Sequence, residues 1–223
     1  MAFFLLFDLS FLGANIVKLT HGGWVPLVVG AVVFTVMTTW KRGRAALYTY
    51  IKGATPRMNA FIAELERDEP HRIPGTAVFM TSDPDGAPPV FVHHLKHNRV
   101  LHERVILLSI VTEHEPLVPR KRRIESRTFG HGIYQVTAHY GFMQSPNVRD
   151  VLLRAKAAGV PCGDETEATF YLGRETLLLG GDAKMMRWRK SLFAYLSRNA
   201  RPATSFFRIP PDRVVELGMQ IQL

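Results

Sequence analysis

Four histidines that could bind a metal ion or a proton lie close together in one segment of this 223-residue chain: His93, His94, His97 and His102. His93 and His97 are four residues apart, which is a spacing that helical metal ligands use. We predict one helix over 90–103, and on a helix Glu103 would point away from its neighbour His102. No cysteine or acidic residue therefore completes a ligand set. We interpret the histidines as packing and hydrogen-bonding groups and predict no metal site.

Two isolated residues are further candidates for chemistry. Asp8 interrupts an apolar segment, where a carboxylate could relay protons or cations. We favour a simpler interpretation, in which Asp8 lies near the start of a helix whose dipole stabilises a negative charge. Cys162 is the single cysteine, which excludes an internal disulfide and fits a reducing compartment. Because no activating base lies near it in the sequence, we predict that Cys162 acts as a small buried hydrophobic side chain.

The remaining motifs do not assemble an active site. Residues 179–182 read Leu-Gly-Gly-Asp, a turn that lacks the lysine and the spacing of a phosphate-binding loop, although ligand sensing at such a turn stays open. We find no Ser-His-Asp, paired-carboxylate or Cys-His arrangement. We therefore predict no catalytic residue, no cofactor-binding residue, no cofactor and no enzymatic activity.

Basic residues exceed acidic ones, and the formal net charge is +9. One basic run, PRKRR, covers 119–123. A second segment, 184–201, contains no acidic residue and carries Lys184, Arg187, Arg189, Lys190, Arg198 and Arg201, with a predicted buried stripe of Met185, Trp188, Leu192 and Leu196. We interpret these charges as solvated faces, with contact to anionic lipid or another acidic ligand as the alternative. Nucleic-acid binding is disfavoured because exposed aromatics are not interleaved with the charges.

The N-terminal quarter of the chain is typical of a membrane segment. Residues 24–40 form an uncharged apolar run with tryptophan at both ends, and at about 1.5 Å per residue it is about 26 Å long. Lys41, Arg42 and Arg44 follow directly, which places this end in the cytoplasm. A second apolar run, 2–19, precedes a Gly-Gly turn, and it lacks the features of a removable signal peptide. We predict a two-helix transmembrane hairpin over 1–44, with 41–223 cytoplasmic.

The rest of the chain predicts a connector helix within 45–72 and then an α/β domain with a mixed sheet over 73–223. The connector has an apolar stripe of Met58, Phe61, Ile62 and Leu65 at helical spacing. Asp83 to Gly86 predicts a turn. We expect strands at 76–81, 105–112, 124–128, 133–140, 169–172 and 176–179, and helices at 90–103, 147–158 and 184–199. Asn147 is the expected cap of the second of these helices, and Gly159 is expected to end it.

Several of these segments resemble the corresponding stretches of one known family. The strings are GANIVKLTHGGWVPLVVGAVVFTVMTTWKRGR, IPGTAVFMTS, HHLKHNRVLHERVILLSIVTE and FRIPPDRVVELGMQIQL, in that order. They resemble the C-terminal portion of Kup-type potassium uptake permeases, the KUP/HAK/KT family, which comprises the last two membrane helices and the cytosolic domain. The blocks are ungapped and follow the family's order, so the resemblance covers essentially the whole chain.

This resemblance implies a multi-pass protein of the cytoplasmic (inner) membrane whose full-length parent couples potassium uptake to protons. The family's ion site belongs to earlier helices, so no ion-site residue is carried over and we expect no transport by this chain alone. The implied partners are potassium and protons in the parent and the lipid bilayer, with anionic lipids at Lys41, Arg42 and Arg44. A homodimer stays open. The competing hypothesis is a membrane-tethered sensory or ligand-binding domain with no transport role.

Overall fold

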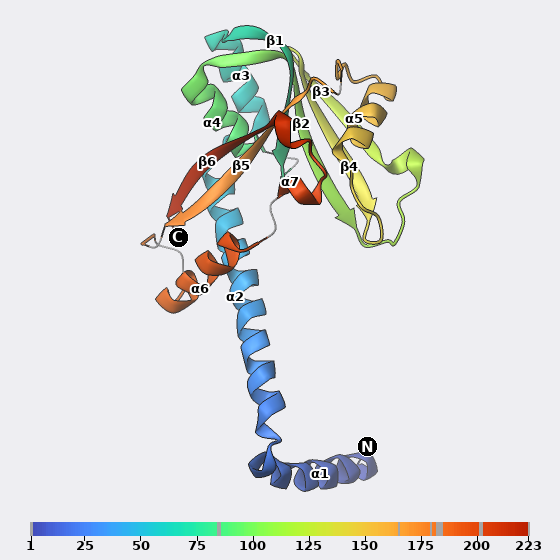
Figure 1. Ribbon diagram of the computed structural model, residues 1–223, viewed down its shortest axis with the longest axis vertical. Coiled ribbons are helices and arrows are strands. Elements are labelled where there is room, and N and C mark those ends of the chain that lie inside the picture. The colour runs from blue at the N-terminus through green and yellow to red at the C-terminus, as the bar shows by residue number, and fades with distance from the viewer. Residues whose placement is uncertain are drawn as a thin grey trace. The chain divides into compact units, whose positions relative to one another are not determined.

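The computed structural model describes residues 2–83, 86–164, 166–178, 180–181, 185–200 and 203–222 (Figure 1). The chain divides into two compact units. The first comprises residues 1–46 and 183–198, and the second comprises 47–182 and 199–223. The segment 183–198 thus belongs with the apolar N-terminus, although it is distant from it in sequence.

The described part of the first unit is mainly helical. Helix α1 (Ala2–Ile16) leads through the 3-10 helix η1 (Val17–His21) to α2 (Trp24–Ala54). Gly22 joins them with a φ of 104°, a left-handed conformation that glycine adopts at little cost. Helix α2 does not end at the basic residues but continues to Ala54, because no proline interrupts it there. The predicted connector region therefore contains the end of α2 as well as α3 (Met58–Asp68).

The second unit contains a mixed sheet, as the sequence predicts, and this sheet has six strands. Its strands are β1 (His71–Thr81), β2 (Val100–Glu113), β3 (Ile124–Gly130), β4 (Ile133–Gly141), β5 (Thr169–Leu178) and β6 (Val214–Gln222). The strand order is β3-β4-β2-β1-β5-β6. Only β3 runs antiparallel to its neighbour, whereas the other pairings are parallel. Parallel strands need covering on both faces, which explains the long apolar runs of β1 and β2.

Helices cover both faces of this sheet and create two cores. Helices α3 and α4 (Pro89–Asn98) lie on one face, and α5 (Val148–Ala157) lies on the other (Figure 1). Alternate residues of each strand enter opposite cores: Phe79 packs with α3 and α4, whereas its neighbour Val78 packs with α5. The 3-10 helices η2 (Arg120–Arg122) and η3 (Pro211–Arg213) and the short α7 (Ala203–Phe206) complete the unit.

Two predicted helices form as their periodicity requires. All four residues of the connector stripe are buried in α3. In α5, Val148, Val151, Leu152 and Ala155 are fully buried. Asn147 caps this helix, because its side-chain oxygen accepts a hydrogen bond from Arg149 N at 3.0 Å. Gly159 follows the helix with a φ of 93°.

The helix predicted over 90–103 is too long. Helix α4 ends at Asn98, and Arg99 adopts a left-handed conformation with a φ of 54°. Strand β2 then begins at Val100, so His102 lies on a strand and not on the histidine-bearing helix. The sequence prediction failed because parallel pairing of Val100, Leu101 and His102 with the start of β1 outweighs local helical periodicity.

The predicted strands at 169–172 and 176–179 are one strand, β5. Gly173, Arg174 and Glu175 do not interrupt it, because each pairs with a residue of β6. The sequence analysis did not predict β6, although its sequence carries part of the family resemblance. Strand β1 also begins earlier than expected, and Pro74 is accommodated at a register shift between Ile73 and Thr76.

Helix α6 (Arg187–Arg198) exposes and buries different residues from those predicted. Trp188, expected in a buried stripe, is half-exposed, whereas Lys190, Phe193 and Ala194 are buried. The tertiary packing of α6 on α2, and not the helix's own apolar pattern, selects the buried face. Lys184 and Arg201 lie outside the described residues, as do Pro84 and Asp85 of the predicted turn.

Candidate functional site

Helix α2 presents a continuous apolar surface. Its exposed large hydrophobic residues run from Trp24 to Trp40, and Tyr48 and Tyr50 further along the helix are also exposed. Among the described residues it is the one helix that is long and apolar enough to cross a membrane, whereas the apolar α1 is shorter. An exposed apolar band of this length requires an apolar surrounding. The predicted second span of the hairpin, which α1 would form, stays a prediction.

One face of α2 becomes buried beyond the apolar run. Thr39, Gly43 and Leu47 are buried at four-residue spacing, so they share one face of the helix. Helix α6 lies against this part of the helix (Figure 1), where the rings of Trp40 and Phe193 pack edge to face with centroids 5.7 Å apart. A Cβ added at Gly43 would overlap the Phe193 ring. The glycine therefore allows α6 to approach the α2 backbone closely.

Three basic residues of α2 surround this helix contact. Lys41, Arg42 and Arg44 are exposed, and none of them has an ion-pair partner among the residues that the structure describes. Their charges are thus available to groups outside the chain. Directly after an apolar span, such cations favour the cytoplasmic side of a membrane.

The predicted histidine cluster divides into two pairs. His93 and His97 share one side of α4, with ring centroids 4.4 Å apart. His94 and His102 are buried beside the ring of Tyr171. Within the described chain, no group of three or more His, Cys, Asp or Glu side chains is placed to hold a metal ion.

The two buried histidines serve as packing groups. His94 also forms a 2.9 Å hydrogen bond between its Nδ1 and Asn98 Nδ2. Burial lowers the pKa of His94, and the charge of His102 lowers it further. Burial alone lowers the pKa of His102. Both rings therefore favour the neutral state, which is compatible with their apolar surroundings.

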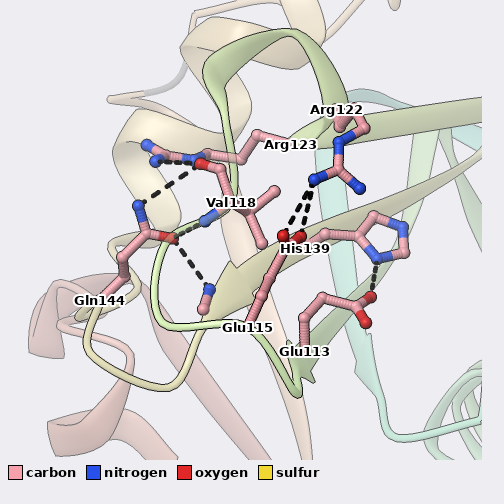
Figure 2. A network of polar contacts seen from close by, with 8 residues as sticks. Glu113, Glu115, Val118, Arg122, Arg123, His139 and Gln144 are labelled. Carbon is pink, nitrogen blue, oxygen red and sulfur yellow. Dashed lines mark hydrogen bonds and ion pairs between the residues drawn. The ribbon is translucent and has the colours of Figure 1, made fainter.

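Part of the basic run at 119–123 is used within the domain (Figure 2). Arg122 Nη2 contacts both carboxylate oxygens of Glu115, at 2.9 and 3.0 Å. Arg123 donates to the carbonyl oxygen of Val118 at 3.1 Å, and its guanidinium lies over the ring of Tyr140 at 5.2 Å. These two arginines stabilise the loop between β2 and β3 instead of forming an open basic patch.

Two further side chains complete this polar network (Figure 2). Gln144 Oε1 accepts hydrogen bonds from Val118 N at 3.1 Å and from Gly141 N at 2.8 Å. His139 Nδ1 lies 2.6 Å from Glu113 Oε1. Gln144 satisfies backbone donors of two segments at once, so it links the β2–β3 loop to the end of β4. Sequence reasoning missed this residue, because a single glutamine carries no local signal of such a role.

A cavity of about 550 Å³ opens near the start of α3. Among the described residues, its lining includes the cations Lys52, Arg57 and Arg127, the carboxylate of Asp83 and the neutral polar side chains of Thr55, Asn59 and Gln135. Met58 and Phe129 contribute apolar surface. Such a lining suits a small anionic molecule with an apolar part. No residue of this cavity was predicted as a binding residue.

The other single candidates lie at separate places among the described residues. Cys162 is buried and not disulfide-bonded, as predicted, and its carbonyl oxygen accepts a hydrogen bond from Thr76 Oγ1 at 3.0 Å. Asp8 is exposed on α1. Gly180 has a φ of 143°, whereas Leu179 and Asp182 of the same motif lie outside the described residues.

The apolar helix and the α/β domain each match a known family model. Residues 1–45 match the K+ potassium transporter integral membrane domain, and residues 74–223 match the K+ potassium transporter C-terminal domain. These two features define a membrane transporter class with an attached α/β domain. The chain belongs to the K+ potassium transporter family.

Curated relatives of this chain are named as potassium transport proteins. It is 49% identical over 223 residues to the probable potassium transport system protein Kup 2 of Syntrophobacter fumaroxidans, covering 100% of this chain and 35% of that protein. It is 51% identical over 228 residues to the probable potassium transport system protein Kup of Anaeromyxobacter dehalogenans strain 2CP-C, covering 99% and 33% respectively. The chain thus spans about one third of the length of these relatives. No solved structure matches it.

Proposed function

We propose that this chain supplies the C-terminal part of a permease that couples potassium uptake to protons in the cytoplasmic membrane. The observation that carries the proposal is the ordered match of residues 1–45 to the membrane domain and of 74–223 to the C-terminal domain. The relatives named as potassium transport proteins support the same role. We propose no catalytic activity, no cofactor and no nucleic-acid partner.

The proposed organisation has a transmembrane hairpin over 1–44, a connector over 45–72 and a cytosolic α/β domain over 73–223. The exposed cations Lys41, Arg42 and Arg44 support a cytoplasmic location for residues 41–223 and contact with anionic lipids. The α/β domain regulates or stabilises the permease, alone or as a homodimer. The ion site lies on membrane helices outside this chain, so this chain alone does not transport potassium.

A chimaera tests this proposal. The C-terminal third of the Syntrophobacter fumaroxidans Kup 2 relative is replaced by this chain, and growth at low potassium is measured in cells that lack their own potassium uptake systems. We expect the chimaera to restore growth and potassium uptake, whereas this chain alone does not. A chimaera that reaches the membrane in normal amounts but takes up no potassium would contradict the proposal.

The cationic cavity favours the competing hypothesis of a membrane-tethered ligand-binding domain. Lys52, Arg57 and Arg127 suit an anionic ligand, with pyrophosphate and ATP as suitable probes. Calorimetric titration of the full chain in detergent, compared with Arg127→Ala, tests this hypothesis. Saturable binding that Arg127→Ala weakens, together with a chimaera inactive in uptake, would favour a sensory role without transport.

A further inference from the structure

Helix α6 meets α2 where α2 leaves the membrane. Gly43, which contacts Phe193, lies nineteen residues after Trp24. At about 1.5 Å per residue this separation is roughly 28 Å, close to the thickness of a hydrocarbon core of about 30 Å. A span that begins at Trp24 therefore places the contact with α6 at the level of the lipid headgroups.

The side of α6 that faces away from α2 is apolar and aromatic. Phe193 and Ala194 are buried, whereas Trp188 and Tyr195 are 50% and 61% exposed. Trp188, Leu192 and Tyr195 follow one another at i, i+4 and i+7, so they form one stripe. On a helix this stripe lies opposite the buried face of Lys190, Phe193 and Ala194. Among the described residues, the Phe193 side of α6 is buried, whereas Trp188 and Tyr195 on the other side stay at least half exposed.

The charges of α6 have one sign. The helix contains Arg187, Arg189, Lys190 and Arg198 and no acidic residue. Arg187 and Arg198 are exposed at its two ends. Tryptophan and tyrosine gather at membrane interfaces, and basic residues beside such aromatics bind anionic headgroups. A second copy of α6 is a poorer partner for this stripe, because a two-fold contact would bring equal positive charges together.

We propose that α6 is an interfacial helix whose stripe of Trp188, Leu192 and Tyr195 inserts into the cytoplasmic leaflet, with Arg187 and Arg198 on anionic headgroups. The packing of Phe193 against Gly43 and Trp40 holds the helix at this depth. The inference rests on the membrane placement proposed above. It adds a second membrane contact, formed by a segment about 145 residues beyond the span.

Site-directed spin labels on the full chain test the proposal. Tyr195→Cys carries the label, in nanodiscs of phosphatidylcholine with or without phosphatidylglycerol. Buried Cys162 is retained, and the chain without an added cysteine gives the background signal. Val32→Cys in the middle of the α2 span and Leu153→Cys on the exposed face of α5 are the matched controls. The measured quantity is the collision rate with oxygen relative to that with a water-soluble nickel chelate.

We expect the ratio at Tyr195 to lie between those of the two controls, several-fold above Leu153, and to rise further when phosphatidylglycerol is present. Charge reversal by Arg187→Glu with Arg198→Glu should abolish that further rise. If the ratio at Tyr195 equals that at Leu153 while the ratio at Val32 is high, as expected deep in the bilayer, the α6 proposal alone would be overturned. An aqueous signal from Val32 would instead overturn the membrane placement itself.

Two other outcomes would also overturn the proposal. Protection of Tyr195 from both reagents, with spin–spin broadening, would assign the stripe to a second copy of the chain. An interfacial ratio that is the same in both lipid compositions would remove the role of anionic headgroups.

Discussion

The ring of Phe193 occupies the space beside Gly43 that a Cβ atom would need, and this contact joins two helices 150 residues apart in sequence. The edge-to-face packing of Phe193 on Trp40 continues the same contact. Glycine at this position is thus a steric requirement of the fold and not a helix-ending signal.

Gly43→Ala should loosen α6 from α2. Overpacking of this kind costs about 1–3 kcal/mol, and each 1.4 kcal/mol changes a local opening equilibrium about tenfold. Because α6 contains Arg187 and Arg189, the expected result is tryptic cleavage within α6 that is about tenfold faster or more in detergent-solubilised chain. Gly30→Ala is the matched control, since a Cβ there would meet nothing within 4 Å. Equal cleavage rates in both variants would refute the steric argument.

The stability of the α/β domain should fall as the solution is acidified. Burial lowers the pKa of His94 and His102 below the ordinary value of 6.5, so the unfolded chain binds more protons than the folded chain as the pH falls below 6.5. The stabilisation is fully present above pH 6.5 and is lost progressively below it. Denaturant unfolding of the full chain at about pH 7.5, 6 and 5 measures this effect.

Variants separate these histidines from the other titrating groups. His102→Gln should reduce the acid sensitivity, whereas His97→Gln, at an exposed position, should retain it. Unchanged pH dependence in His102→Gln would show that other groups cause the loss of stability.

Gln144 should contribute more to stability than the Arg122–Glu115 ion pair. Gln144→Ala leaves the backbone N–H groups of Val118 and Gly141 without their acceptor, at a cost of about 1–3 kcal/mol. Glu115→Gln weakens a largely exposed ion pair, at a cost of about 1 kcal/mol or less. Chemical denaturation measures both free energies of unfolding.

Gln144→Glu is a control for the loop, because it keeps the accepting oxygen atoms. It should therefore be less destabilising than Gln144→Ala. If Glu115→Gln proves the most destabilising of the three variants, the ranking of these interactions is wrong.

Cys162 should behave as a structural residue. Its thiol is buried, so a maleimide should label it slowly in the folded chain and rapidly in denaturant. Cys162→Ala should leave potassium uptake by the chimaera unchanged. Rapid labelling of the native chain, or loss of uptake together with normal membrane levels, would indicate a reactive role instead.

Much of the domain could be predicted because its helices and strands carry clear periodicities. The α3 stripe that includes Phe61 and Leu65 and the α5 stripe that includes Val151 and Leu152 are buried as expected. The mixed sheet also follows from the alternation of apolar runs with helical segments. The end of α4 and the continuity of β5 could not be predicted, because each depends on pairing with a strand distant in sequence.

For the candidate sites, too, the sequence predicted part of the arrangement and the fold shows the rest. The basic run at 119–123 was identified, yet only the fold shows that Arg122 and Arg123 are engaged with Glu115 and Val118. The cationic cavity joins Lys52 and Arg57 to Arg127, seventy residues away, and no local pattern connects them.

The sequence by itself determined the apolar span from Trp24, the cations that follow it and the amphipathic helices, because these depend on neighbouring residues along one element. The tertiary structure alone decided which face of α6 is buried. Its own periodicity favours burial of Trp188 and Leu192, but the gap left by Gly43 accepts Phe193 instead. A helix with two apolar faces buries the one that finds a complementary surface, and that surface belongs to a segment 150 residues away.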